Sequence, residues 1–261
     1  MKKRTAIIGA ILSLLPFGQA FLIKTSIVLP TAGFILSIPQ KAIAEGAEFY
    51  DESGFKKIEK GDFDGAISDF TKAIKFNRRS SRSYYLRGLV QFELKNYKAA
   101  ISDYTKAIKI NPQYSQAFND RARAKAKLKN YKGAFSDYGK SIKIEPNSHF
   151  VYYDRALTKL DLKDFKGALS DINKAIAIKP RNVQLLYRRG SIKFVLENEK
   201  GAISDFTEVI SINPNSARAF NARGLVKVFL KDDKGAKSDY RKALKIDPNF
   251  YQAYISLAKL K

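Results

Sequence analysis

Charged side chains of opposite sign recur in this chain at a fixed interval of 34 residues. An arginine is followed sixteen residues later by an aspartate, and a planar guanidinium binds a carboxylate through two parallel hydrogen bonds. We expect each arginine to lie between the aspartate of its own copy and that of the preceding copy. Such a ladder fixes the register between copies more than it adds stability. A functional alternative is that the arginines hold an acidic ligand. The ladder residues are Arg87, Arg121, Arg155, Arg189, Arg223, Asp69, Asp103, Asp137, Asp171, Asp205 and Asp239.

The side chains that usually carry catalysis or bind metals are scarce. The chain has no cysteine and a single histidine, His149. One histidine without a cluster of other ligands supports neither a metal site nor a serine–histidine relay. The carboxylates stand in repeated columns instead of one converging pair, and no glycine-rich phosphate loop is present. We therefore predict that the protein is not an enzyme and has no catalytic residues, no metal site and no cofactor.

The charged columns stand on a repeated helical pattern. In residues 81–114, apolar side chains recur at helical spacing on both sides of a short break at Asn96. Every copy has Asp or Asn at that break, where a short oxygen-bearing side chain caps the start of a helix. Five of the six copies close with a proline, which cannot continue a helix. Each copy is therefore a helix–turn–helix, and we number the copies 1 to 6: 47–80, 81–114, 115–148, 149–182, 183–216 and 217–250.

A fixed period of this length predicts an all-α solenoid, because each unit can bury its apolar face only against its neighbours. Residues 251–261 follow the last copy and have the pattern of a short helix. We expect this helix to cap the array by covering the last apolar face.

These columns resemble the tetratricopeptide repeat (TPR) family over about four-fifths of the chain. The resemblance implies a right-handed α-solenoid whose first helices line a concave side. The chain departs from the family pattern where arginine replaces the usual leucine and lysine mostly replaces tyrosine in the first helix. Copy 1 matches the family pattern less closely than the other copies, with Arg78 in the place of proline. The motif residues in copy 2 are Tyr84, Gly88, Ala100, Tyr104, Ala107 and Pro112.

The same resemblance implies a partner-binding groove along the first helices. Tyrosine and arginine supply large contact area at modest entropic cost. We expect Tyr85, Tyr153 and Tyr187 to be exposed there. For Phe92 and Phe194, packing between neighbouring helices is an open alternative. The Lys–Asn clamp of the family's chaperone-tail binders is absent, so that ligand class is not expected. The groove residues are Arg82, Tyr85, Leu89, Phe92, Gln116, Asn119, Phe150, Tyr153, Leu157, Gln184, Tyr187, Phe194, Arg218 and Asn221.

Residues 1–44 lie outside the repeats. Three basic residues at 2–4 precede an apolar run at 5–23, and small residues at 42–44 offer a signal-peptidase site after Ala44. This pattern predicts a secretory signal peptide. The alternative is an uncleaved membrane anchor formed by residues 5–23, which are long enough to span a bilayer. Either reading exports the array from the cytoplasm, to a periplasm, a lumen or the extracellular space.

The chain carries a formal charge of +23, which favours anionic partners. Lysines recur in two columns, one just past the turn and one in the second helix. They form either a solvated surface or a docking surface for an anionic membrane or envelope polymer. Nucleic acid is not expected as a partner, because the predicted export separates the protein from it. The two columns contain Lys98, Lys132, Lys166, Lys200 and Lys234, and Lys72, Lys106, Lys140, Lys174 and Lys242.

These observations predict a non-catalytic, exported scaffold for protein–protein interaction. Its concave groove would bind a peptide or a helix of a partner protein. The alternative is an envelope tether that binds an anionic membrane or polymer through its basic columns.

Overall fold

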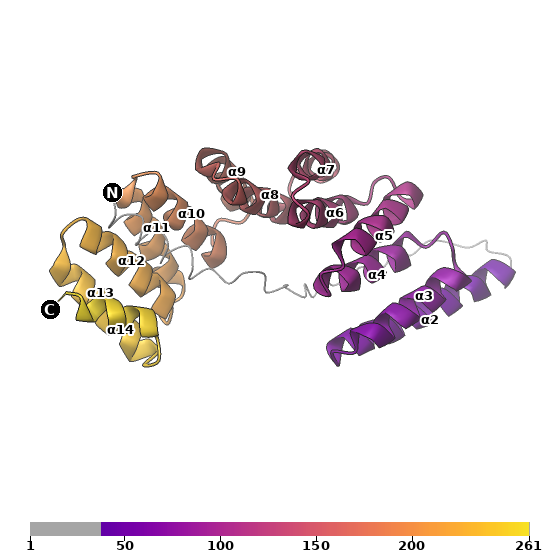
Figure 1. The fold of residues 1–261 in the computed structure, drawn as a ribbon, viewed down its shortest axis with the longest axis horizontal. Coiled ribbons are helices and arrows are strands. Elements are labelled where there is room, and N and C mark those ends of the chain that lie inside the picture. The colour runs from indigo at the N-terminus through magenta and orange to yellow at the C-terminus, as the bar shows by residue number, and fades with distance from the viewer. Residues whose placement is uncertain (1–37, 261) are drawn as a thin grey trace. The chain divides into compact units, whose positions relative to one another are not determined.

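The computed structural model describes residues 38–260, which contain thirteen α-helices and no β-strand (Figure 1). The described residues fall into two compact units, 38–146 and 147–260. In each unit the helices pair in chain order, and successive pairs stack on one another. The prediction of an all-α solenoid of helix–turn–helix repeats is confirmed.

The first unit consists of three helical pairs. The first helix of each pair packs on the second, and the second helix packs on the first helix of the next pair. The helices are α2 (Ile38–Glu59), α3 (Phe63–Phe76), α4 (Ser81–Glu93), α5 (Tyr97–Ile110), α6 (Ser115–Lys127) and α7 (Tyr131–Ile144).

The second unit repeats this arrangement with three pairs and one closing helix. The helices are α8 (His149–Asp161), α9 (Phe165–Ile178), α10 (Val183–Val195), α11 (Glu199–Ile212), α12 (Ala217–Phe229), α13 (Asp233–Ile246) and α14 (Tyr251–Ala258). Helix α14 packs on α13 and α12 and buries Ala253. Its Tyr251 and Tyr254 remain exposed.

Helix α2 begins at Ile38, nine residues before the first copy defined by the sequence. The cleavage point proposed after Ala44 therefore lies inside this helix. The predicted signal peptide or anchor otherwise falls on residues 1–37, which lie outside the described residues.

The turn inside each copy has the same backbone in all six copies. The residue before the Asp or Asn has a left-handed conformation, with φ of 60° to 63° at five non-glycine positions and 78° at Gly61. In five of the six copies the Asp or Asn side chain then accepts a hydrogen bond from the backbone N–H three residues later, as Asp164 does from Gly167 over 2.9 Å. The left-handed residue ends one helix, and the side-chain bond caps the start of the next.

Copy 2 shows why glycine usually stands three residues after the cap. A Cβ atom on Gly167 would lie 2.1 Å from the Asp164 carboxylate. Copy 2 carries Ala99 at this place, and its Asn96 makes no capping hydrogen bond. The Asn96 amide instead donates to the Gln91 side chain over 3.0 Å.

Within each copy, small residues of the first helix lie against a large residue of the second helix. The large residue is an aromatic ring in five copies and Ile172 in copy 4, and all six are essentially inaccessible to solvent. A Cβ atom on Gly88 would lie 2.7 Å from the Tyr104 ring, and one on Gly224 would lie 2.6 Å from the Tyr240 ring. The missing side chain is therefore what allows the two helices to approach closely.

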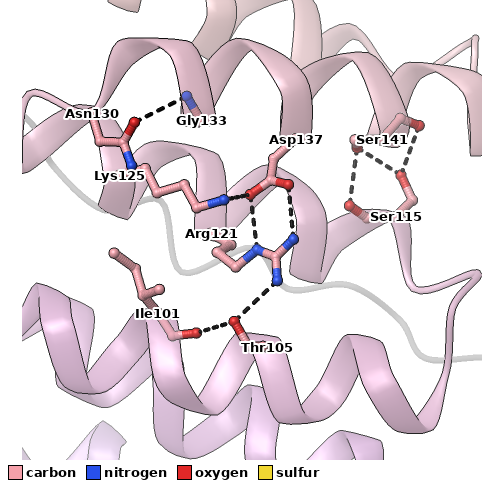
Figure 2. Close-up of polar contacts among 9 residues, drawn as sticks. All are labelled: Ile101, Thr105, Ser115, Arg121, Lys125, Asn130, Gly133, Asp137 and Ser141. Carbon is pink, nitrogen blue, oxygen red and sulfur yellow. Dashed lines mark hydrogen bonds and ion pairs between the residues drawn. The ribbon is translucent and has the colours of Figure 1, made fainter.

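The repeated arginine and aspartate also join the two helices of a copy. Arg121 donates from Nε and Nη2 to the two carboxylate oxygens of Asp137, both over 2.8 Å (Figure 2). Lys125 adds an ion pair to the same carboxylate at 2.7 Å. The four other arginines of the column bind the aspartate of their own copy in the same way: Arg87 with Asp103, Arg155 with Asp171, Arg189 with Asp205 and Arg223 with Asp239.

We expected a ladder in which each arginine lies between two aspartates. This expectation is wrong for the three arginines whose remaining nitrogen, Nη1, binds a threonine instead of a second aspartate. Nη1 of Arg87, Arg121 and Arg223 donates over 3.0 Å to a threonine of the preceding copy. Figure 2 shows this bond from Arg121 to Thr105. A neutral hydroxyl therefore links these copies, and the ion pairs of the repeated arginine and aspartate columns stay inside each copy.

The first two copies vary this cluster without leaving the carboxylate unpaired. Copy 1 has Ser53 in the arginine column, and Asp69 accepts from Ser53 and pairs with Lys57 and Lys72. Copy 2 has Gln91 in the place of the lysine, and Arg87 pairs with Asp103.

These pairs change the acidity of the buried aspartates. Burial alone raises the pKa of Asp171, but hydrogen bonds from Arg155 and Lys159 outweigh it, so the pKa lies below 3.8. Hydrogen bonds from Arg121 and Lys125 likewise outweigh burial and lower the pKa of Asp137. A carboxyl group with a lowered folded pKa stabilises the fold above its unfolded pKa and stops doing so in acid.

Our first prediction tests the close approach of the two helices. Gly224→Val should destabilise the protein by about 2 kcal/mol, because added atoms must displace the buried Tyr240 ring. Gly139→Val is the matched control, since nothing lies within 4 Å of its Cβ position. Urea unfolding should show a normal or slightly higher midpoint for the control. Equal losses in both variants would contradict the packing argument.

Our second prediction concerns the ion pair within a copy. A double-mutant cycle on Arg155 and Asp171 should give a coupling energy of about 1–3 kcal/mol at pH 7. A cycle on Arg189 and Asp171, which belong to successive copies, should give a coupling close to zero. Because the pKa of Asp171 is lowered, the first coupling should be present above pH 4 and disappear as the pH falls through the folded pKa. Coupling in the second cycle alone would support the hypothesis that each arginine binds the aspartate of the preceding copy.

Candidate functional site

The first helices contact one another within each unit and form what we call the first-helix layer. Helices α2, α4 and α6 make this layer in the first unit. The second unit has a layer of its own, in which α10, α12 and α14 contact one another and α8 joins α10 through the Tyr153 hydroxyl. The residues assigned to the groove from the sequence lie at three levels of burial. Exposed are Gln116, Phe150, Gln184 and Arg218; half-buried are Arg82, Tyr85, Leu89, Phe92, Tyr153 and Leu157; buried are Asn119, Tyr187, Phe194 and Asn221.

Two aromatic residues of the expected groove belong to the packed interior. Tyr187 is 8 % exposed and its ring centroid lies 5.3 Å from that of Phe206, so the expectation that it is exposed is wrong. Phe194 is fully buried and lies edge-to-face against Phe229. Both pack between helices, because Tyr187 lies against Phe206 of its own copy and Phe194 lies against Phe229 of the next copy.

In the first unit, an acidic residue holds the tyrosine of the layer. Tyr85 donates from its hydroxyl to Asp120 over 2.8 Å, and its ring lies 4.8 Å from that of Tyr114. Arg123 pairs with the other oxygen of Asp120 at 2.8 Å and lies over the Phe92 ring. Aromatic and charged side chains therefore alternate along this part of the layer.

A buried carboxyl group, missed in the sequence analysis, lies at the start of the same layer. Asp51 is 3 % exposed, accepts from the Ser83 hydroxyl over 3.0 Å and lies 4.0 Å from Arg82. Its second oxygen has no hydrogen-bond partner. Burial raises the pKa of Asp51 to about 6. The signal was an acid standing in the column that elsewhere holds Tyr85 and Tyr153.

In the second unit, the hydroxyl of Tyr153 accepts hydrogen bonds from two polar side chains of α10. It accepts from the Gln184 amide over 3.0 Å and from Arg188 Nη2 over 3.2 Å. Arg188 is 7 % exposed and its guanidinium also lies 5.8 Å from the centre of the Tyr153 ring. Arg188 was not assigned to the site from the sequence, because its column holds glutamate, leucine, aspartate or alanine in other copies.

The single histidine lies at the start of α8. Its ring centroid is 3.9 Å from that of Phe150, and burial lowers the pKa of His149 below its usual value. The described part of the chain holds no group of His, Cys, Asp and Glu side chains arranged to bind a metal ion. Among residues 38–260, no helix combines the length and the apolar content that crossing a bilayer requires.

A hollow of about 440 Å³ lies at the turn edge of the first unit. Gln91, Tyr97 and Leu128 line it, so it is separate from the residues assigned to the groove. Its polar lining comes from the copy 2 turn, where Asn96 binds Gln91 instead of capping a helix.

The two lysine columns have different surroundings. The column just past the turn is exposed in every copy that carries it. In the second-helix column, Lys140, Lys174 and Lys242 lie over the rings of Phe118, Tyr152 and Phe220 at 5.6–5.7 Å. Copy 5 loses both partners together, with Leu186 in place of the ring and Glu208 in place of the lysine. The second-helix lysines thus cover aromatic surface of their own copy.

Comparison with known proteins gives the same repeat unit. Two family models described as tetratricopeptide repeat match the chain, one at residues 81–114 and the other at 151–182, 183–216 and 217–250. No curated protein sequence matches the chain.

Solved structures resemble the chain in fold at low sequence identity. YrrB, described as a TPR protein with an unusual peptide-binding site, has a TM-score of 0.59 at 20 % identity, covering 72 % of this chain and 96 % of YrrB. PilF of Pseudomonas aeruginosa has a TM-score of 0.70 at 15 % identity, covering 84 % of this chain and 99 % of PilF. The type IV pilus biogenesis factor PilW has a TM-score of 0.71 at 13 % identity, covering 81 % of this chain and 98 % of PilW.

TPR proteins are generally scaffolds for protein interaction and are typically not catalytic. The 34-residue period, the paired helices and the family matches lead to one conclusion: this chain belongs to the tetratricopeptide repeat family.

Proposed function

We propose that the protein is an exported, non-catalytic scaffold that binds a peptide or a helix of a partner protein on its first-helix layer. The observation that carries this proposal is the set of half-buried aromatic and polar side chains on that layer. Tyr153 and Tyr85 combine an apolar ring with a polar tip, which suits them to the centre of an interface. The peptide-binding site in the description of YrrB supports the same class of partner.

Polar atoms without partners in the layer also support a binding role. The hydroxyl of Tyr187 and the whole amide of Asn221 are buried and make no hydrogen bond. An unpaired buried polar group costs about 1–3 kcal/mol, and Asn221 is 0 % exposed, so a ligand recovers that free energy only by parting the helices that cover these groups. An amide offers both a donor and an acceptor, which is what a peptide backbone requires.

Export rests on the sequence of the first 44 residues alone. We propose that residues 1–44 carry the chain out of the cytoplasm, as a signal peptide or as an anchor. Mass spectrometry of the mature N-terminus distinguishes the two, since cleavage after Ala44 leaves Glu45 as the first residue.

A second candidate function is an envelope tether. The exposed lysine column past the turns favours it, because Lys166, Lys200 and Lys234 stand at the turn edge of three successive copies of the second unit in solvent. Such a surface would bind anionic lipid or polymer through charge alone, and the attraction would be screened by salt.

Our third prediction separates the two candidates. Tyr153→Ala combined with Gln184→Ala should abolish capture of a partner protein by the full chain, because both changes remove side chains of the layer. The matched control is Lys166→Ala combined with Lys200→Ala at the turn edge, which should leave capture intact. Affinity capture from the native envelope at low and high salt is the measurement.

Groove binding should depend weakly on salt, since it buries mostly uncharged area. Capture that survives the layer variant, fails in the lysine variant and disappears at high salt would favour the tether.

A further inference from the structure

Leucines that are exposed to solvent recur at one place in the repeat, the end of the first helix. In copies 2 and 3 they are Leu94 and Leu128, which are 38 % and 42 % exposed. Each is the residue at which its helix ends, and the turn follows directly. A leucine in water forgoes the free energy of burial, so exposed leucines in two adjoining copies indicate a surface that contacts something else.

Lysines surround these two leucines, and no acid stands among them. The turns read Leu-Lys-Asn-Tyr-Lys at residues 94–98 and again at 128–132. The other four turns each contain at least one Asp or Glu, such as Asp62 in copy 1. The nearest acid in the sequence, Glu93, interacts electrostatically with Arg123 of the first-helix layer. The exposed lysines are Lys95, Lys98, Lys127, Lys129 and Lys132.

The two turns share one surface. The hollow of about 440 Å³ is lined by Lys95, Tyr97 and Lys98 of copy 2 and by Leu128 of copy 3. The Tyr97 ring lies edge-to-face against that of Phe92, with 5.3 Å between the ring centroids. Pockets for small ligands in proteins have volumes of roughly 300–1,000 Å³, so this hollow is large enough for a small polar group. We call the two leucines, the five lysines and Tyr97 the cationic turn edge.

We propose that the cationic turn edge docks on the surface of an anionic phospholipid bilayer. Leu94 and Leu128 enter the boundary between the headgroups and the acyl chains, the lysines bind lipid phosphates, and the hollow receives one headgroup. Binding at a membrane surface combines buried apolar area with attraction between basic side chains and anionic lipid. The inference rests on the second candidate function and narrows it to a lipid partner and to the first unit.

The leucines decide between a bilayer and other anionic partners. A nucleic acid or a charged polymer would bind the lysines and leave Leu94 and Leu128 in water. A bilayer presents phosphates with an apolar layer directly beneath them, and side chains at the ends of helices can reach both. Tyr97 has an apolar ring and a polar tip, and tyrosine is enriched at membrane interfaces for this reason.

Our fourth prediction tests this docking surface with a fluorescent probe placed in it. The chain contains no tryptophan, so Leu128→Trp in the full chain gives an emission that comes from the turn edge alone. On addition of phosphatidylglycerol vesicles, this emission should shift to shorter wavelength, because the indole leaves water for the boundary of the acyl chains. Brominated acyl chains should quench it. Phosphatidylcholine vesicles, which carry no net charge, should produce neither change.

The matched control is Gln113→Trp, which places the same probe in the exposed loop between α5 and α6, at the opposite end of these helices. Its emission should stay unchanged with both kinds of vesicle. Any vesicle binding by the apolar run at residues 5–23 is common to both variants and both lipids, so it cannot produce the difference. Leu94→Trp repeats the measurement in copy 2 and decides the question if Leu128→Trp folds poorly.

The lysines supply a second measurement. In the Leu128→Trp background, Lys95→Gln combined with Lys98→Gln should raise the lipid concentration at half-maximal shift about 30-fold, since each lysine near an anionic membrane contributes about fivefold. Lys106→Gln combined with Lys109→Gln removes the same charge from exposed positions of α5 outside the turn edge. This control should leave the lipid concentration at half-maximal shift nearly unchanged.

Absence of a shift with phosphatidylglycerol in both leucine variants would overturn the proposal, and so would an equal shift in Gln113→Trp. Salt-sensitive capture on the native envelope without a vesicle response would refute lipid docking and leave a tether to an anionic polymer or an acidic protein. Tyr153→Ala combined with Gln184→Ala should not alter the vesicle response, so loss of groove binding and loss of lipid docking are separate results.

Discussion

The close approach of two helices within each copy is the constraint on which the remaining structure depends. A glycine or alanine of the first helix lies against a buried large residue of the second, and little space is left between them. This contact sets the distance at which a short turn must join the helices. It also places the opposite face of each first helix in the layer of its own unit, where side chains are free to differ between copies.

The polar cluster of each copy is built around the same contact. The arginine and the lysine approach one carboxylate from the first helix, so the aspartate of the second helix is neutralised where it is buried. Departures from the pattern occur in pairs. Ala99 accompanies an uncapped Asn96, and Leu186 accompanies Glu208, because each residue is useful only beside its usual partner.

The 34-residue period, together with the capping residues and the prolines, was enough to predict the helical pairs. Helices start at Ser81, Ser115, His149, Val183 and Ala217, the positions at which copies 2 to 6 begin. Local signals decide these starts, since caps and prolines act on the nearest few backbone groups. The pairing of each arginine with its own aspartate also follows from the two columns.

The surroundings of individual side chains did not follow from the columns. Tyr153 and Tyr187 share a column, yet one hydroxyl binds Gln184 and Arg188 and the other is buried unpaired. Periodicity states which face of a helix a residue occupies, whereas its burial depends on the volumes contributed by two neighbouring copies. Asp51 and Arg188 were missed for the same reason, because each departs from its column and only its contacts show what the departure does.

The confinement of the repeated Arg–Asp ion pairs within single copies has a consequence for how such a chain can change in length. Loss or duplication of a whole 34-residue segment leaves every aspartate with its own arginine or, in copy 1, with its serine and lysines. Within this cluster, only a hydroxyl contact at the new junction is exchanged. An alternating ladder would instead leave a carboxylate without its arginine at each junction, so in the observed arrangement recombination can shorten or extend the array without an electrostatic penalty in this cluster.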